Sequence, residues 1–231
     1  MTHAPSYAPY VSRPTTEITP QPRLSQLSSA ERARLERRAR LLAWGGNAWH
    51  LVEFGVALGA GIVAGSVALI GFGADSLIEA LAAFVIVWLF SGGRGSSERA
   101  ERSAQRLIAA TYFILVAYIG TESIRDLIGG HRPATSWVGI GLASFTAPTM
   151  PLLAAAKRRV GRKLSSRATV HEAQQNQICA YLSVALLVGL LLNALAGWWW
   201  ADPAAALVIG AVALNEGIES WRGESCSDDC C

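Results

Sequence analysis

Charged residues are scarce in this chain of 231 residues: Asp, Glu, Lys and Arg make up 16%, whereas hydrophobic residues make up 52%. The apolar residues are clustered in stretches of roughly twenty that are almost free of charge. A helix needs about that length to cross a hydrocarbon core of about 30 Å. The composition therefore excludes a soluble α/β enzyme.

Cysteine is also scarce, and its distribution excludes a disulfide framework. Of the four cysteines, Cys179 lies inside an apolar run, while Cys226, Cys230 and Cys231 fall within the last six residues. The motifs HExxH and GxSxG are absent as well. A secretory signal would need an apolar core near the N-terminus, and the first 27 residues contain none.

The chain divides into four regions by composition. The first carries five of the nine prolines and few aliphatic residues, so we expect it to be disordered. The second begins with a capping box, Ser28 to Glu31, and forms a basic helix. This helix either lies on anionic lipid headgroups or extends the first span into solvent. The regions are a disordered tail (1–27), a basic interfacial helix (28–40), a transmembrane domain (41–220) and a Cys/Asp-rich tail (221–231).

Six apolar segments predict an all-α, polytopic membrane protein with six transmembrane helices. The short links Ala64-Gly65-Ser66 and Ala201-Asp202-Pro203 indicate that the first and last pairs are tight hairpins. Glu216 interrupts the apolar part of the last span. The predicted spans are Leu41–Ala64, Ser66–Phe90, Leu107–Ile128, Trp137–Ala156, Gln174–Trp200 and Pro203–Ser220.

The basic residues predict the orientation. Eighteen of the twenty Lys and Arg residues lie in the N-terminal region, in two long loops (one of them KRRVGRKLSSR) and in the C-terminal tail. Only Arg125 and Arg132 fall at the opposite face. The positive-inside rule then places both termini in the cytoplasm. We expect the protein in the plasma (inner) membrane of a bacterium.

Carboxylates within the second span indicate where function lies, because each costs at least about 2.5–3.5 kcal/mol near the centre of a membrane helix. Asp75 and Glu79 are four residues apart, on one face of one helix. Two carboxylates this close repel each other in a low dielectric unless one of them is protonated or a divalent cation binds between them. The alternative is a pair of neutral or arginine-paired carboxyls, but the first two spans contain no Lys or Arg.

Polar residues in the first span share one face. Asn47, His50 and Glu53 follow at spacings of three. Glu53 could be a third carboxylate of the site, a partner of its ligands or a packing residue, whereas we interpret His50 as structural. The glycine pairs Gly55/Gly59 and Gly61/Gly65 predict close helix packing.

The fifth span could complete the site. Gln175, Asn176 and Cys179 step inward at helical spacing. A cysteine thiolate would favour a borderline or soft metal such as Zn²⁺ over Mg²⁺. Alternatively, the two amides only form hydrogen bonds with neighbouring helices.

Two separate motifs resemble the cation diffusion facilitator family of metal/proton antiporters. The run AGSVALIGFGADSLIEALA resembles the signature of its second span, and GWWWADPAAALVIGAVAL is similar to its link from the fifth to the sixth span. The resemblance covers residues 41–220 and places the motif positions on Asp75 and Glu79, with Glu in place of the usual Asp. It implies efflux of a divalent transition metal, zinc first, by proton antiport, with the metal held between the second and fifth helices.

The sequence departs from this family in two places. The fifth span normally offers His or Asp followed by Asp four residues later, where this chain has Asn176 and Ala180, or Gln175 and Cys179. A cytoplasmic metal-binding domain usually follows the sixth span, but here only eleven residues follow Ser220. We therefore expect any homodimer to rest on membrane helices.

Alternatives remain for the role of the C-terminal tail and for the function of the whole protein. Cys226, Cys230 and Cys231 could capture a soft metal in the cytoplasm, or be incidental, lipidated or redox-active. A metal-binding or scaffold membrane protein without transport is the first rival function. The second is an intramembrane hydrolase, suggested by GFGAD, but the matching Tyr-Asp pair is missing. We expect that the protein is not an enzyme and that it has no permanently bound cofactor and no nucleic-acid partner.

Overall fold

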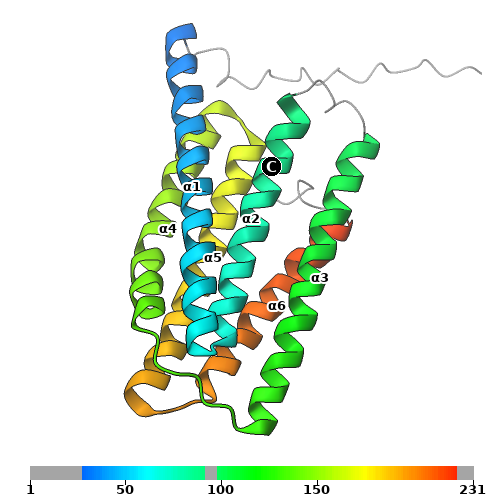
Figure 1. Cartoon of the computed structure of the whole chain (residues 1–231). Helices are drawn as coiled ribbons and strands as arrows, with labels where there is room; N and C mark the ends of the chain where they lie inside the picture. Colours follow the sequence, from blue (N-terminus) through cyan, green and yellow to red (C-terminus); the bar gives the residue numbers. More distant parts are fainter. Residues whose placement is uncertain (1–27, 92–97, 223–231) are drawn as a thin grey trace, which may run out of the picture.

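The computed structural model describes residues 28–91 and 98–222. Within these ranges the chain forms six α-helices and no strand (Figure 1), and all six are long and apolar enough to cross a membrane. The predicted all-α, six-span membrane fold is therefore confirmed. The helices are α1 (Ser29–Ala64), α2 (Val67–Ser91), α3 (Glu98–Gly129), α4 (Trp137–Leu164), α5 (Arg167–Ala196) and α6 (Ala201–Arg222).

Two predicted regions lie outside the described residues. These are the N-terminal tail, 1–27, and nearly all of the C-terminal tail, with Cys226, Cys230 and Cys231.

The helices extend beyond the predicted spans at the arginine-rich end of the bundle. The capping box is confirmed: the Ser28 side chain accepts the Glu31 N–H at 3.2 Å, and the Glu31 carboxylate accepts the Ser28 N–H at 3.0 Å. From there α1 continues into the first span without a break. Likewise α4 runs through most of the predicted basic loop and ends at Leu164, followed by the C-cap residue Ser165 with a φ of 51°. Ala, Arg, Lys and Glu are good helix formers, so these turns stay helical after the apolar run ends.

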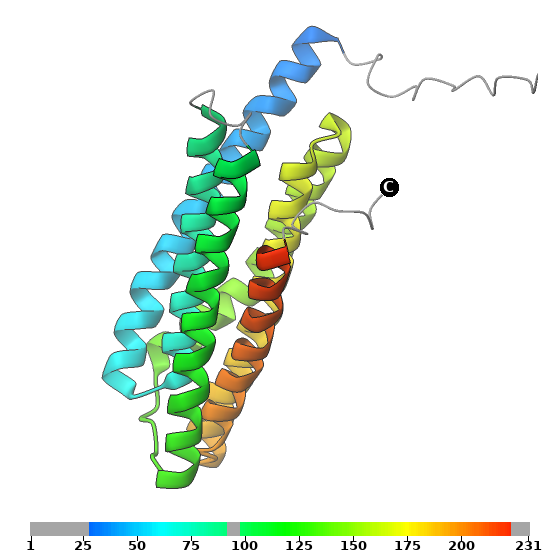
Figure 2. The same cartoon turned by 90° about the vertical axis from the view of Figure 1, so that its right-hand side faces the viewer.

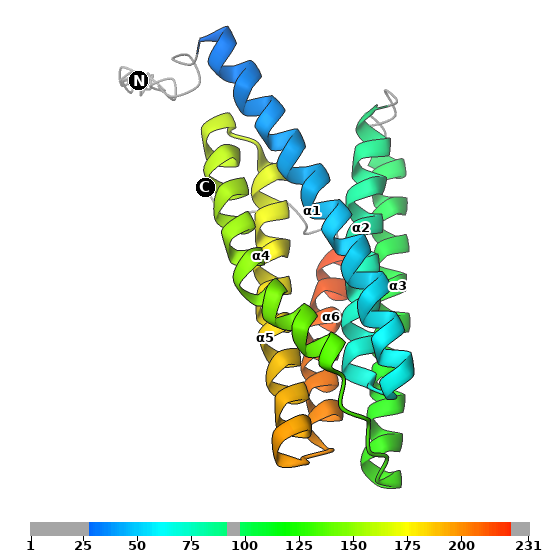
Figure 3. The same cartoon turned by 60° about the vertical axis from the view of Figure 1, so that its left-hand side comes forward.

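The six helices form a bundle of antiparallel pairs. Helix α1 packs against α2 and α4, α4 against α5, and α3 against α6. Figures 1 and 2 show α3 and α6 side by side. In Figure 3 the first turns of α1 project beyond the ends of α4 and α5. The start of α1 and the end of α6 lie on the same side of the bundle, as an even number of spans requires.

Glycines allow α1 and α2 to approach each other closely. A Cβ atom on Gly61 would lie 2.9 Å from the backbone nitrogen of Ile70, and one on Gly73 would lie 3.0 Å from that of Leu58. The predicted packing role is confirmed for Gly61. Gly55 and Gly59 face open space, with nothing within 4 Å of an added Cβ, so for this pair the prediction is wrong within a single chain.

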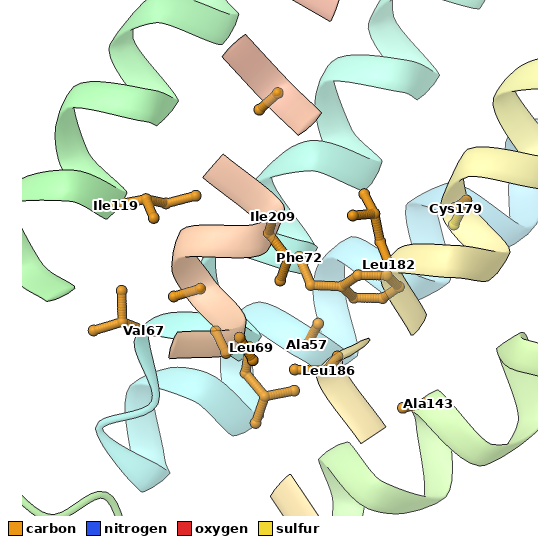
Figure 4. Packing of buried hydrophobic residues seen from close by; sticks show 14 of the residues in the cluster. Ala57, Val67, Leu69, Phe72, Ile119, Ala143, Cys179, Leu182, Leu186 and Ile209 are labelled. Atoms are coloured by element: carbon orange, nitrogen blue, oxygen red, sulfur yellow. The ribbon is translucent and has the colours of Figure 1, made fainter. Parts of the chain in front are cut away.

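The apolar core gathers around Phe72 of α2. Its ring is fully buried and belongs to one cluster with Leu182 and Leu186 of α5 and Ile209 of α6 (Figure 4). Cys179 of α5 is part of the same cluster. The polar side chains described below therefore lie at the border of a dry core.

A buried aspartate joins the start of α6 to the start of α2. The Ser66 hydroxyl donates to Asp202 Oδ1 at 2.5 Å, and the Ala68 N–H donates to Asp202 Oδ2 at 3.3 Å. Ser66 itself accepts the Leu69 N–H at 3.1 Å. The first N–H groups of a helix have no partner within the helix, so Asp202 and Ser66 together satisfy the start of α2. Asp202 thus lies in the first turn of α6 rather than in a loop.

We expect Asp202→Ala to lower the free energy of unfolding by about 2 kcal/mol, because it leaves buried donors on α2 without an acceptor. Unfolding of the purified protein in mixed micelles, followed by circular dichroism, measures this. Glu219→Ala on the same helix is the control, since Glu219 is exposed and bonds only its neighbour Asn215. Equal stability of the two variants would contradict the capping role.

We expect Gly73→Val to destabilise the protein by about 1–3 kcal/mol, because the added side chain meets the backbone of α1. Gly141→Val introduces the same side chain into a helix where space is open. The same unfolding measurement should show little effect of Gly141→Val. A comparable loss in both variants would argue against the close contact.

Candidate metal site

Helix α1 presents a narrow buried face that carries two ionisable side chains. The buried residues of this helix are Gly46, His50, Glu53, Ala57, Gly61 and Ala64. Their spacings of three and four place them in one stripe along the helix. Small residues on both sides of His50 and Glu53 let the neighbouring helices come close. The side chains of this pair consequently point into the bundle, where Glu53 is fully buried.

Three different kinds of ligand meet at this face. Nitrogen of His50 (α1), a carboxylate oxygen of Glu79 (α2) and sulfur of Cys179 (α5) all lie within 4.8 Å of one another, and all three residues are buried. Asn176 of α5 adds its amide, with Nδ2 at 3.3 Å from His50 Nε2. Three helices thus bring together an imidazole, a carboxylate and a thiol.

Two carboxylates share one imidazole nitrogen. His50 Nδ1 lies 3.1 Å from Glu53 Oε2 and 3.1 Å from Glu79 Oε2. One nitrogen carries at most one proton, and only the contact with Glu53 has the geometry of a hydrogen bond. Glu79 Oε2 is consequently left without a hydrogen-bond partner among the described residues. A buried carboxylate in this position calls for a cation or a proton.

Glu53 is held by His50 of its own helix and by neighbours from three other helices. Thr146 of α4 donates to Glu53 Oε1 at 2.7 Å. The other oxygen, Oε2, accepts from His50 and has Ser76 of α2 at 3.5 Å and the Cys179 thiol at 3.8 Å. Because Glu53 contacts both His50 and Cys179, it can orient two members of the cluster.

A cavity of about 60 Å³ lies beside the cluster and is lined by Asn47, His50, Glu79 and Asn176, among others. Three of its lining residues, Asn47, Glu79 and Asn176, each carry a buried oxygen (Oδ1, Oε2 and Oδ1) with no hydrogen-bond partner in the described part of the chain. Buried polar atoms are nearly always bonded, so three free acceptors at one cavity indicate a missing donor or cation. The cavity is far smaller than the roughly 300–1,000 Å³ of sites for organic ligands.

Asp75 and Gln175 both interact with a further carboxylate, that of Glu216 on α6. Asp75 is buried, but it does not belong to the group formed by His50, Glu79 and Cys179. The carboxylates that interact with Asp75 are Glu79 on its own helix, Glu216 of α6 and Glu53 of α1. Gln175 Nε2 donates to Glu216 Oε2 at 3.4 Å. Within the acidic pair of the second span, Glu79 therefore belongs to the group with His50 and Cys179, whereas Asp75 does not and also interacts with Glu216 of α6.

Sequence reasoning missed four polar or sulfur-containing side chains near the cluster. His50 was expected to be structural, yet it lies between the two glutamates. Thr146 and Met150 of α4 carried no signal, although Met150 Sδ lies 3.2 Å from Asn176 Nδ2. Lys157 was counted in a basic loop, and this was wrong: it belongs to α4 and is buried. The one available signal was helical spacing: Met150 follows Thr146 by four residues and Lys157 follows Met150 by seven, which places all three on one face of a helix.

Residues 48–222 match the family model of the cation efflux transmembrane domain. The chain belongs to the cation diffusion facilitator family. The match includes α2 to α6 and the second half of α1, and thus the segments that carry His50, Glu79 and Cys179. The resemblance found in the two sequence motifs is thereby confirmed.

Curated relatives of this chain are few and distant in sequence. An uncharacterized transporter of Synechocystis sp. is 27% identical over 198 residues, which are 82% of this chain and 63% of that protein. The magnetosome protein MamB of Magnetospira sp. (strain QH-2) is 27% identical over 170 residues, or 69% of this chain and 57% of MamB. The chain thus spans less than two thirds of the length of either relative. Both the family and the name of the first relative describe transporters rather than enzymes.

The structure shows how this member of the cation diffusion facilitator family differs in its fifth span. The sequence offered two pairs at a spacing of four, Asn176 with Ala180 or Gln175 with Cys179. In the bundle, Cys179 belongs to the cluster and Asn176 lies beside it, and the spacing of these two residues is three. Metal coordination by Asp75, Glu79, Glu53, Gln175, Asn176 or Cys179 stays a prediction.

We expect Thr146→Val to destabilise the protein by about 1–2 kcal/mol, because the nearly isosteric side chain removes the donor to buried Glu53. Thr121→Val is the matched control, since Thr121 is exposed and bonds only the carbonyl of Ala117 within its own helix. Unfolding in mixed micelles compares the two. If Thr146→Val were as stable as Thr121→Val, Glu53 would not depend on this contact.

Proposed function

We propose that the protein exports a divalent transition-metal cation, zinc first, from the cytoplasm by proton antiport. The observation that carries this proposal is the buried group of His50, Glu79 and Cys179 within a cation efflux domain. In this proposal the metal binds between α2 and α5, with α1 supplying His50. Glu53 and Asn176 act as further ligands or hold the ligands in place.

The ligand types support a borderline metal as substrate. Imidazole, thiolate and carboxylate are the common ligands of Zn²⁺, whereas Mg²⁺ and Ca²⁺ prefer oxygen alone. With bonds of about 2.0–2.3 Å, ligand atoms around a tetrahedral Zn²⁺ lie about 3.3–3.8 Å apart. The three atoms lie within 4.8 Å of one another, so a contraction of about 1 Å would suffice.

Proton coupling follows from the same ligands. Cysteine must be a thiolate, histidine neutral and glutamate ionised to bind metal, so binding releases protons and weakens as the pH falls. An outward-facing site that meets a more acidic exterior would exchange its metal for protons. Asp75 interacts with Glu216, which accepts from Gln175, and provides a second polar position one helical turn from Glu79 for either ion.

The cellular setting in this proposal is a bacterial plasma membrane with both termini in the cytoplasm. The positive-inside rule supports it, because the described ends of α1, α3 and α4 that carry the basic residues lie on one side of the bundle. A homodimer through membrane helices is part of the proposal, and the exposed Gly55 and Gly59 offer a surface for close backbone contact. Cys226, Cys230 and Cys231 are proposed to capture metal before transport.

We expect Glu79→Gln to reduce zinc-dependent proton flux in proteoliposomes more than tenfold, because it removes an anionic ligand from the cluster. Flux is measured with a pH-sensitive dye trapped inside vesicles. Glu122→Gln is the control, since Glu122 pairs with Arg125 at the other end of the bundle. Wild-type vesicles that bind Zn²⁺ but carry no proton flux would indicate the rival function, a membrane protein that binds metal without transporting it.

The assignment of Asp75 is tested in the same vesicles. Asp75→Ala should slow the exchange of Zn²⁺ for protons, because it removes the second carboxylate of the pathway. An exchange rate equal to that of the wild type would remove Asp75 from the site.

A further inference from the structure

Lys157 is a buried cation close to the candidate metal site. Among the Lys and Arg residues whose side chains the structure describes, it alone is buried, with 5% of its side chain exposed. Its Nζ lies 3.1 Å from Glu172 Oε2 on α5, and the Glu172 side chain is 33% exposed. Removing an ammonium group from water is costly, and packing α4 against its neighbours does not require it.

The bundle makes room for this ammonium group against the backbone of α1. A Cβ atom on Gly46 would lie 2.9 Å from Lys157 Nζ. Gly46 is one turn before His50 on the buried stripe of α1. The charged end of Lys157 is therefore in contact with three helices, α1, α4 and α5, one turn from a candidate ligand.

Lys157 and the candidate ligands line the same small cavity. Its walls include Lys157 and Glu172 together with His50, Glu79 and Asn176. Of these lining residues, Glu79 and Asn176 each have a buried oxygen without a hydrogen-bond partner in the described part of the chain, and Glu172 is partly exposed. A volume of about 60 Å³ holds a few water molecules at most, so an ion in the cavity could not avoid the ammonium group.

We propose that Lys157 is an affinity-determining residue: a resident cation at the mouth of the cavity, paired with Glu172, that weakens metal binding at the site formed by His50, Glu79 and Cys179. This inference rests on the proposed metal site. Two positive charges repel far more strongly in a small buried cavity than in water. An ammonium group held beside the ligands keeps the site from retaining its metal, and Glu172 holds that group in place.

The two members of this ion pair should change metal affinity in opposite directions. Lys157→Gln removes the positive charge and frees Glu172, so Zn²⁺ should bind at least tenfold more tightly. Glu172→Gln leaves the ammonium group in the cavity without its counter-ion, so Zn²⁺ should bind more weakly. A purely structural role of the pair predicts weaker binding in both variants, because both would loosen the contact between α4 and α5.

Isothermal titration of the full chain in detergent with Zn²⁺ measures both effects. Lys163→Gln is the control, since Lys163 is exposed on the same helix and should leave affinity unchanged. Lys157→Met, which is neutral and of similar length, repeats the test with a side chain suited to a buried position. In proteoliposomes the neutral variants should lower both the KM for Zn²⁺ and kcat, because tighter binding slows release.

The outcomes separate this inference from the function on which it rests. Tighter binding in Lys157→Gln or Lys157→Met, with weaker binding in Glu172→Gln, supports it. Wild-type protein whose Zn²⁺ binding is lost in Glu79→Gln, but whose affinity is unchanged or lower in the folded Lys157 variants, overturns the role of Lys157 alone. Wild-type protein that binds no Zn²⁺, or binds it equally well with Glu79→Gln, overturns both.

Discussion

Two glutamates buried against a single histidine nitrogen are the constraint around which this bundle is arranged. Glu53 and Glu79 each lie 3.1 Å from His50 Nδ1, in a protein whose helices cross a membrane. Carboxylates at such a depth are stable only when donors or cations surround them. Thr146, Ser76 and the Cys179 thiol contact Glu53, whereas one oxygen of Glu79, a residue that lines the cavity, has no hydrogen-bond partner among the described residues. One glutamate is therefore held by the protein, and the other is available to a ligand.

This arrangement requires that α1 and α2 approach each other closely and that α2 keeps a fixed position along the bundle axis. Gly61 and Gly73 bring the backbones of α1 and α2 together, which lets side chains as short as Glu79 and His50 meet. Asp202 caps α2 from the first turn of α6, so the depth of Glu79 is determined by a contact far along the chain. The polar cluster thus depends on the packing of α2, since a displacement of this helix by one turn would separate Glu79 from His50 and Cys179.

Much of the fold could be predicted because membranes impose simple rules on sequence. Apolar length predicted the spans, and the Ser28 and Glu31 pattern predicted the start of α1. The start of α3 was predicted too late and the end of α4 too early. Hydropathy marks where a helix leaves lipid and not where its hydrogen bonds end. The candidate site was foreseen in part: Glu53, Glu79, Asn176 and Cys179 lie around one cluster, while Asp75 and Gln175 lie toward Glu216.

The sequence by itself determined the number of helices, the membrane environment and the asymmetry of charge, because each depends on local composition. It also determined that carboxylates in the second span had to serve some purpose. Only the tertiary structure decided which polar groups meet. Helical spacing places Asp75 and Glu79 on one face, but only Glu79 meets His50 of α1 and Cys179 of α5. Lys157 is the clearest case: it reads as one more basic loop residue, and only the crossing of α4 with α1 and α5 makes it a buried charge beside the site.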